Sequence, residues 1–437
     1  MDLAGIAALL TSEGWALLES LPAYDEQDAI GLAEQLRAHG HPPELVSAAL
    51  TQSRLRAAAR SKFGPFADGM LFTPEGLEQA TRLSVAARHA HRFTAAGITR
   101  VADLGCGIGA DSMALATFDR DVIAIDRDEP TAAVATMNLR HWPDVVVRCE
   151  DATTTDLYGI DGAFLDPARR TAAGKRVLDP RLASPPLSFA TGLARQLPAV
   201  GVNTAPGIGH ELIPDGAGAQ WISVGGDVVE AGLWFGLLAR DGVRRSALLL
   251  PADPGPGAAG PDPTAPGPDG GPGPAPDRSG RSGRSGGTDP AEGSDPAGEP
   301  VEVNDIDLPE VGAGTLGQVL YEPDGAVIRA GLVGQVAAAV GGRLVDRSIA
   351  YVTADRFTRT PLATGYAVED AFPFQLKRLR TWLRDRGIGR LEIKKRGTAV
   401  EPEQLRRQLR LTGSEEATLV LTRLQGRQYV VIVRRLR

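Results

Sequence analysis

The sequence predicts an α/β fold with a mostly parallel, seven-stranded sheet, and three observations lead to this prediction. Short apolar runs alternate with helical patterns between residues 96 and 250, as expected for strands joined by crossover helices. A glycine-rich turn follows the first apolar run, and acidic residues stand at the ends of the first three runs. Because parallel strands end at the same edge of a sheet, these acids are expected to lie close together.

Hydrophobic periodicity assigns the elements of this region. The seven apolar runs that we interpret as strands are residues 100–104, 121–126, 144–149, 160–165, 198–203, 219–224 and 245–250. Helical patterns near residues 110–117, 130–140 and 186–196 fall between them. This alternation favours a sheet that is covered by helices on both faces.

The regions on either side of this core have different compositions. Residues 1–95 predict an N-terminal helical region, with a helix that Ser12 caps and further helices beginning near Asp25 and at Pro42-Pro43. Residues 251–300 contain 13 Pro and 13 Gly and almost no large apolar side chain, so we expect a disordered linker there. Residues 301–437 predict a C-terminal α/β region, whose last part (about 371–437) has the order helix–strand–helix–strand–strand.

Charge is distributed unevenly along the chain. Residues 371–437 hold 17 Lys and Arg against 6 Asp and Glu, a net charge of +11. Because the whole chain carries −7, the remainder carries −18. A basic end on an acidic body indicates either a polyanionic partner or a solvated basic surface, and the sequence leaves both readings open.

The cysteine count and the absence of long apolar runs limit the class of protein. Cys106 and Cys149 match neither a disulfide framework nor a metal-ligand spacing, so we expect no metal. No run of about 20 apolar residues occurs, and the N-terminus has no basic leader. These features predict a cytoplasmic protein that does not enter membranes. They leave the oligomeric state open, and a monomer is compatible with them.

The glycine-rich turn and the acids after it predict a nucleoside-binding site. The residues of the turn that we expect to contact the ligand are Asp103, Gly105, Cys106, Gly107 and Gly109. Asp126, followed by Arg127, ends the second strand 23 residues after Asp103, where a carboxylate accepts from ribose hydroxyls. Asp151, followed by Ala152, comes after the third strand and is placed to accept from an adenine amino group.

Several acids in one pocket disfavour a dinucleotide, and the spacing G-x-G-x-G also differs from the dinucleotide pattern. The acids instead suit S-adenosylmethionine, which carries a sulfonium and an ammonium but no phosphate. Helix capping is the alternative role for Asp126 and Asp151. In these motifs the region 96–250 resembles the Rossmann-like class I S-adenosylmethionine-dependent methyltransferases. The resemblance implies that Asp103 and the glycines lie along the methionine part, with Asp126 at the ribose and Asp151 at the adenine.

The fourth strand ends in Asp166-Pro167-Ala168-Arg169. In the methyltransferases that it resembles, this strand end faces the methyl group, and amino-methylating members carry Asp/Asn-Pro-Pro-aromatic there. The resemblance implies that Asp166 contacts both cofactor and substrate and that Pro167 and Arg169 belong to the catalytic site. Arg169 in place of the aromatic residue is suited to stacking on a base or holding a phosphate.

Three further segments have an expected role at the same site. Arg170 and Lys175 extend the basic cluster beside Arg169, as substrate contacts or as part of a solvated loop. Phe72-Thr73 precedes the core, either as a lid over the cofactor or as the capped start of a helix. The segment 203–207 follows the fifth strand and is expected to line the substrate side.

The C-terminal region carries Lys394, Lys395 and Arg396 at a predicted strand end before Gly397. This motif and the element order resemble the THUMP-like domain found at the C-terminus of some bacterial methyltransferase-like proteins, which implies RNA binding through these cations. The sequence thus predicts a methyltransferase acting on a tRNA or rRNA nucleotide. A small-molecule or protein methyltransferase and a catalytically inactive RNA-binding relative are the alternatives.

Overall fold

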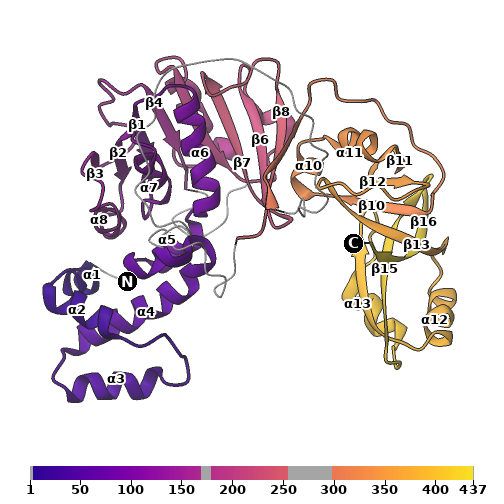
Figure 1. Cartoon of the computed structure of the whole chain (residues 1–437), viewed down its shortest axis with the longest axis horizontal. Coiled ribbons are helices and arrows are strands. Elements are labelled where there is room, and N and C mark those ends of the chain that lie inside the picture. The colour runs from indigo at the N-terminus through magenta and orange to yellow at the C-terminus, as the bar shows by residue number, and fades with distance from the viewer. Residues whose placement is uncertain (1–2, 169–178, 254–297, 437) are drawn as a thin grey trace, which may run out of the picture.

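The computed structural model describes residues 3–168, 179–253 and 298–436. N-terminal helices, a central sheet and a C-terminal module follow one another along an elongated molecule (Figure 1). The predicted linker falls almost entirely on residues 254–297, outside the described ranges. No helix in the described part of the chain combines the length and apolar character needed to span a membrane.

The N-terminal region is helical, as predicted. Its helices are α1 (Leu3–Leu9), α2 (Ser12–Ser20), α3 (Ala29–Ala38), α4 (Pro43–Phe63), α5 (Pro74–Gln79) and α6 (Leu83–Ala95). The predicted start in Pro42-Pro43 is confirmed, whereas Thr11 rather than Ser12 caps α2, and α3 begins at Ala29 rather than near Asp25. The hydroxyl of Thr11 caps α2 by accepting from the Gly14 N–H at 3.0 Å.

Phe72 belongs to the core and does not form a lid. Its side chain is 0% exposed, and its backbone N–H and C=O both bond to the buried side chain of Gln52. Thr73 caps α5 by accepting from the Gly76 N–H at 2.9 Å. The capped helix is therefore the correct interpretation of this segment, and burial excludes Phe72 from the lid that the sequence suggested.

The central sheet is mixed and has nine strands in the order β3-β2-β1-β4-β5-β7-β6-β8-β9. The strands are β1 (Arg100–Leu104), β2 (Asp121–Asp126), β3 (Val145–Cys149), β4 (Gly162–Leu165), β5 (Ala199–Thr204), β6 (Gly218–Val224), β7 (Asp227–Gly236), β8 (Arg245–Leu250) and β9 (Val301–Asn304). β1 to β5 pair in parallel, and β6 pairs in parallel with β8. β7 is antiparallel to β5 and β6, and β9 is antiparallel to β8.

The prediction of a mostly parallel sheet holds, but seven strands was the wrong number. The predicted set of strands lacked β7, which turns back from β6 at Gly225-Gly226, where both residues have positive φ (60° and 93°). It also missed β9, which comes from beyond the Pro/Gly-rich segment and pairs with the edge of the same sheet.

Helices cover both faces of this sheet, as predicted. α7 (Ala110–Thr117) and α8 (Glu129–Asn138) share one apolar cluster with α6 and with Val101 and Val122 of the sheet. α9 (Leu187–Leu193) packs in a second cluster with Ala102 and Leu104. Because neighbouring residues of β1 enter different clusters, the strand is buried on both faces.

The C-terminal module contains a second sheet of seven strands, in the order β11-β12-β10-β13-β16-β15-β14. Its elements are β10 (Val319–Pro323), α10 (Gly325–Arg329), α11 (Val333–Val340), β11 (Arg343–Asp346), β12 (Ile349–Ala354), β13 (Ala363–Pro373), α12 (Leu376–Asp385), β14 (Ile388–Lys395), α13 (Pro402–Leu409), β15 (Glu415–Leu424) and β16 (Arg427–Arg435). The predicted helix–strand–helix–strand–strand order is confirmed from α12 to β16.

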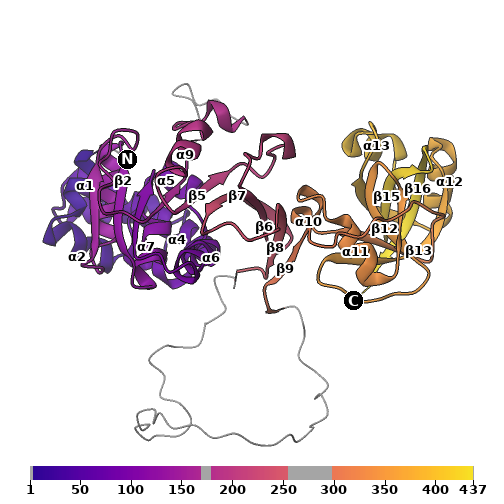
Figure 2. The ribbon, with the colours of Figure 1, turned by 90° about the horizontal axis from the view of Figure 1, so that it is seen from above.

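The module packs directly against the central sheet through α10, which contacts β6, β7 and β8 (Figures 1 and 2). Val327 and Leu332 belong to the same apolar cluster as Trp221 and Leu249 of the sheet. The guanidinium of Arg245 donates to the carbonyl of Ala330 at 3.1 Å across the junction. The two sheets therefore share one continuous core, which fixes the module relative to the central sheet.

This shared core predicts the effect of a truncation at the junction. Leu332→Ala should lower the free energy of unfolding by about 2–5 kcal/mol, because a fully buried leucine leaves a cavity. Both sheets should still unfold in one transition in a denaturant titration. Leu237→Ala is the control, since that side chain is 61% exposed and should cost much less. Equal costs for the two variants would contradict the shared core.

Candidate active site

The glycine-rich loop between β1 and α7 depends on backbone conformations that favour glycine. Gly105, Gly107 and Gly109 have φ values of 90°, 55° and 91°. A Cβ on Gly105 would lie 2.9 Å from the carbonyl oxygen of Asp166, so this residue lets the loop approach the end of β4. The Gly105 and Cys106 N–H groups donate to the carbonyl of Ile125 at 2.9 Å, which ties the loop to β2.

A cavity of about 450 Å³, here called the first cavity, opens at the carboxyl ends of β1, β2 and β4. Of the ten residues predicted to bind the cofactor, nine line it: Asp103, Gly105, Cys106, Gly107, Asp126, Arg127, Asp151, Ala152 and Asp166. Gly109 does not line the cavity; it precedes α7 and packs against Leu139. The structure thus brings the predicted residues together, and their individual roles stay predictions.

Asp103 is the most deeply buried acid of the first cavity, at 1% exposed. Burial, with Asp111 as the next contribution, raises the pKa of Asp103 to about 8, although the Ser112 hydroxyl donates to its carboxyl at 2.5 Å. Burial also raises the pKa of the Cys106 thiol well above its usual value. The free chain therefore holds Asp103 mainly protonated at neutral pH, and a cation placed beside it would favour the ionised form.

Asp126 and Asp151 lie at the ends of β2 and β3, as predicted. The carboxylate of Asp126 accepts from the Gly107 N–H at 3.1 Å and from the Asp128 N–H at 2.9 Å. Burial nevertheless raises its pKa. Asp151 is exposed, and hydrogen bonds from the hydroxyl and N–H of Thr153 lower its pKa. Asp128, rather than Asp126, caps α8, by accepting from the Thr131 N–H.

Asp166 stands between the first cavity and a second one, and it lines both. Its N–H donates to the carbonyl of Leu104, and the Ala168 N–H donates to the carbonyl of Ser184 at 2.9 Å. Pro167 lines the second cavity only. Arg169, Arg170 and Lys175, predicted as catalytic or substrate contacts, lie outside the described residues.

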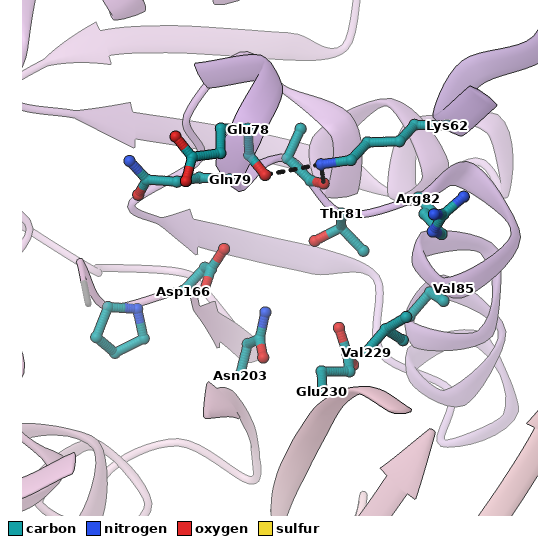
Figure 3. Close-up of a pocket in the computed structure, with 12 residues that line it drawn as sticks. Lys62, Glu78, Gln79, Thr81, Arg82, Val85, Asp166, Asn203, Val229 and Glu230 are labelled. Atoms are coloured by element: carbon teal, nitrogen blue, oxygen red, sulfur yellow. Dashed lines mark hydrogen bonds between the residues drawn. The ribbon is translucent and has the colours of Figure 1, made fainter. Parts of the chain in front are cut away.

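The second cavity has a volume of about 350 Å³ and is shown in Figure 3. It is lined from four directions: by the end of α4 and α5, by the start of α6, by the ends of β4 and β5, and by β7. Asn203, predicted to line the substrate side, lies in its wall. The other lining residues are Lys62, Glu78, Gln79, Ala80, Thr81, Arg82, Val85, Asp166, Pro167, Val229 and Glu230.

A buried histidine connects the two cavities. His89 on α6 contacts Asp111 through Nδ1 at 2.8 Å and Glu230 through Nε2 at 2.7 Å. Burial lowers the pKa of His89, but Glu230 and Asp111 outweigh burial and raise it to about 10. At neutral pH the ring is therefore an imidazolium that donates from both nitrogens. Asp111 lines the first cavity and Glu230 the second.

Sequence reasoning did not assign this triad. Asp111 follows the glycine turn closely but looks like an ordinary first-turn acid of a helix. His89 is a lone histidine on a helix, and Glu230 lies 141 residues further on, in the strand that the analysis missed. No local pattern in the chain marks such a long-range contact.

Two of the three predicted RNA-binding cations have carboxylate partners within the module. The ammonium of Lys394 lies 2.9 Å from Glu322, and that of Lys395 lies 2.7 Å from Glu401. Burial lowers the pKa of Lys394, but Glu322 outweighs it, so the net shift is upward. Arg396 forms no ion pair with a described residue, and its guanidinium lies 5.2 Å from the ring centroid of Tyr351.

The fold and the first cavity define a class I methyltransferase-like protein, because the strand order β3-β2-β1-β4-β5-β7-β6 carries an acid-rich nucleoside site after β1 and β2. Comparison with known proteins gives further evidence for this class of protein. The profile of the "THUMP domain-like" family matches residues 363–435, and a domain of unknown function (DUF8688) matches residues 2–59. The crystal structure of a Porphyromonas gingivalis W83 protein described as a methyltransferase has a TM-score of 0.65, covering 95% of this chain and 100% of that one at 18% identity.

An uncharacterized S-adenosylmethionine-dependent methyltransferase of Mycobacterium tuberculosis, from strains CDC 1551 and H37Rv, is 31% identical over 384 residues. The match covers 85% of this chain and 90% of the relative. The chain belongs to this family of S-adenosylmethionine-dependent methyltransferases, and S-adenosylmethionine is its cofactor. The described site fits that cofactor: several carboxylates and a single cationic side chain, Arg127, line the first cavity, which suits a ligand with two positive charges.

The raised pKa of Asp103 predicts proton release when the cofactor binds. Near pH 7 the free chain holds a proton on Asp103, and the cofactor ammonium should displace it, so affinity should rise with pH up to about 8. Calorimetry with S-adenosylhomocysteine in buffers of different ionisation enthalpy counts the protons. Asp103→Asn should release about one proton fewer than the natural chain and bind about 10- to 100-fold more weakly, as expected when a charged hydrogen bond is removed.

Asp121→Asn is the control for this measurement, because Asp121 stands at the start of β2, at the opposite edge of the sheet, and is exposed. It should leave both proton release and affinity unchanged. Identical proton release in the natural chain and in Asp103→Asn would show that another group carries the proton.

Proposed function

We propose that this S-adenosylmethionine-dependent methyltransferase acts on a nucleotide of structured RNA that its THUMP-like module holds. The observation that carries the proposal is a groove of about 900 Å³ between the central sheet and the module. The ends of β6 and β8, at Gly225 and Leu250, form one side of it, and Lys394, Arg396 and Arg435 contribute from the module. Three acids, Glu299, Glu322 and Asp324, line it as well, and Glu322 pairs with Lys394, which leaves the arginines as the candidate anion contacts. A polyanion is the ligand that suits guanidinium groups gathered along a groove.

The groove opens on the same edge of the sheet as the two cavities. β6 and β8 run in the same direction as β4, because β7 is antiparallel to both β5 and β6. Their carboxyl ends therefore share an edge with Asp166. Since the module is fixed on the sheet through α10, an RNA held in the groove would keep a constant position relative to the second cavity.

Two arginines are the best candidates for phosphate contacts: Arg396, which follows β14 and lines the groove, and Arg423 in β15, which lies beside the groove lining. The Nε atoms of Arg396 and Arg423 are buried, and neither has a hydrogen-bond partner within the described ranges. The two residues lie close together, because a Cβ on Gly397 would be 3.4 Å from Nε of Arg423. Buried donors of this kind are costly unless a ligand accepts from them.

Within the catalytic part, each group has a proposed task. Asp103 accepts from the cofactor ammonium, Asp126 from the ribose hydroxyls and Asp151 from the adenine, while Gly105 lets the loop approach the end of β4. Asp166, which lines both cavities, orients the acceptor group. When bound, S-adenosylmethionine supplies an electrophilic methyl group, and the chain contributes alignment and exclusion of water around the acceptor.

The direct test is transfer of tritiated methyl groups into fractionated cellular RNA, protein and small molecules. We expect label in RNA from the natural chain and at least a tenfold lower rate from Asp166→Ala. Asp215→Ala is the control, because this exposed carboxylate lines neither cavity. Label confined to protein or to small molecules would contradict the proposal, and so would tight RNA binding without any transfer.

The salt dependence of RNA binding tests the proposed phosphate contacts separately. Replacing both Arg396 and Arg423 by alanine should reduce the slope of log K against log salt by roughly one unit for each phosphate that is no longer neutralised. Arg390→Ala is the control, since its guanidinium is 2.5 Å from Glu416 on the neighbouring strand and should change the slope much less. An unchanged slope in the double variant would place the RNA elsewhere.

A further inference from the structure

The second cavity has a wall of hydrogen-bond acceptors whose role the methyltransferase fold alone does not explain. Asp166, Asn203 and Glu230 approach it from β4, β5 and β7, and Figure 3 shows their side chains pointing toward the same space. Asn203 and Glu230 are both only 4% exposed. Such deeply buried polar groups are normally fully hydrogen-bonded.

Two of these side chains have unused hydrogen-bonding capacity. Oδ1 of Asn203 has no partner among the described residues. Glu230 uses Oε1 for the contact with His89, and no described residue donates to its second oxygen. The neighbouring ladder is irregular between Ile222 and Ser223, opposite Glu230, and such an irregularity changes the direction of a side chain.

The cations that line the second cavity are already engaged. The ammonium of Lys62 has three N–H donors, which go to the carbonyls of Leu77, Glu78 and Ala80 at 2.8, 2.8 and 2.9 Å. Arg82 pairs with Asp253 at 2.9 Å. The protein itself thus holds both cations, and the carboxylates of Glu78, Asp166 and Glu230 line the cavity, which disfavours an anionic group as its ligand.

His89 stabilises the buried carboxylate of Glu230 without lining the cavity itself. Its imidazolium donates to Glu230 from outside the cavity and so compensates a buried negative charge that would otherwise be costly. Phe164 and Trp234 pack against the ring at 4.8 and 5.5 Å between centroids, which fixes its orientation. Glu230 consequently presents its second oxygen in a defined direction.

The remaining walls suit the faces of a flat ring. Val85 and Val229 line the cavity on one side. Pro167, which follows Asp166 in the chain, also lines it. The volume of about 350 Å³ is at the small end of the range for small-molecule sites. A ring with apolar faces and an edge rich in N–H donors matches both kinds of wall.

We propose that the second cavity takes a nucleobase by an edge that carries N–H donors, with Glu230 and Asp166 accepting from that edge, so that the methylated atom is a base nitrogen. This inference rests on the proposed function and names the substrate class within it. His89 is a positioning residue that holds Glu230. In the reaction a new N–C bond replaces an N–H bond, the donor sulfur keeps the electrons of the broken S–C bond, and the released proton passes to Asp166 or to water.

The experiment analyses RNA that the natural chain has labelled with tritiated methyl groups, after digestion to nucleosides. We expect the label on a base nitrogen. Label on ribose oxygen or on a base carbon would overturn the inference while leaving the proposed RNA methyltransferase intact. Label absent from RNA but present in protein would instead overturn the proposed function, so the two failures are distinguishable.

Glu230→Gln tests the contact itself in the same assay. This variant keeps an oxygen for His89 but turns part of the acceptor wall into a donor, so kcat/KM for RNA should fall at least tenfold. The Kd for S-adenosylhomocysteine should stay within about twofold, because Glu230 does not line the first cavity. An unchanged kcat/KM, or an equal loss of cofactor affinity, would contradict a role in substrate recognition.

Two further variants separate this effect from charge and folding. Glu34→Gln on α3 makes the same change of charge at an exposed position that lines neither cavity, and it should leave kcat/KM unchanged. Asn203→Ala disturbs no described ion pair and should raise KM for RNA at an unaltered melting temperature. A natural KM in Asn203→Ala would contradict the acceptor wall even if Glu230→Gln folded poorly.

Discussion

The main electrostatic constraint on this structure is that several carboxylates lie at one edge of the sheet, where the chain must compensate their negative charge. Asp103, Asp126 and Asp166 stand at or just after the carboxyl ends of three parallel strands, and Asp111 and Glu230 lie close behind them. The protein provides one buried imidazolium, His89, which is shared by Asp111 and Glu230, and it leaves Asp103 protonated at neutral pH. Without a cationic ligand, the negative charge of this site is only partly compensated. Binding a cofactor that carries a sulfonium and an ammonium group thus follows from the same charges that make the free site costly.

A second constraint is the packing of the C-terminal module on the sheet that carries these charges. α10 inserts apolar side chains into the core cluster of the central sheet, so the module is not a separate body on a tether. The groove between them and the two cavities consequently lie along one edge of the sheet in fixed order. In the proposed function, this arrangement would let a basic module serve an acidic catalytic centre: the phosphates of a long substrate would meet Arg396 and Arg423, whereas its reacting group would enter the second cavity.

Local patterns in the sequence predicted the elements whose determinants are close together in the chain. The glycines after β1 and the acids after β2 and β3 could be recognised because turn chemistry and strand ends are local, and the order from α12 to β16 followed from simple periodicity. The Gly225-Gly226 turn carried a hairpin signal that was overlooked, which hid β7 and with it Glu230. Other features had no local signal: β9 joins the sheet from beyond residues 254–297, His89 meets Glu230 across 141 residues, and the carboxylate partner of Lys394 lies on another strand. The sequence left two interpretations of Phe72 open, because an aromatic residue before a capped helix looks the same whether it is buried or exposed.

The central claim is that carboxylates at the ends of β1, β2 and β3 hold a cationic adenosine donor. A crystal structure of the chain with S-adenosylhomocysteine tests it most directly. The account predicts the ligand in the first cavity, with its amino group within hydrogen-bonding distance of Asp103, its ribose hydroxyls at Asp126 and its sulfur directed toward Asp166. A ligand bound outside this cavity, or bound in it with the adenine at Asp103, would contradict the account.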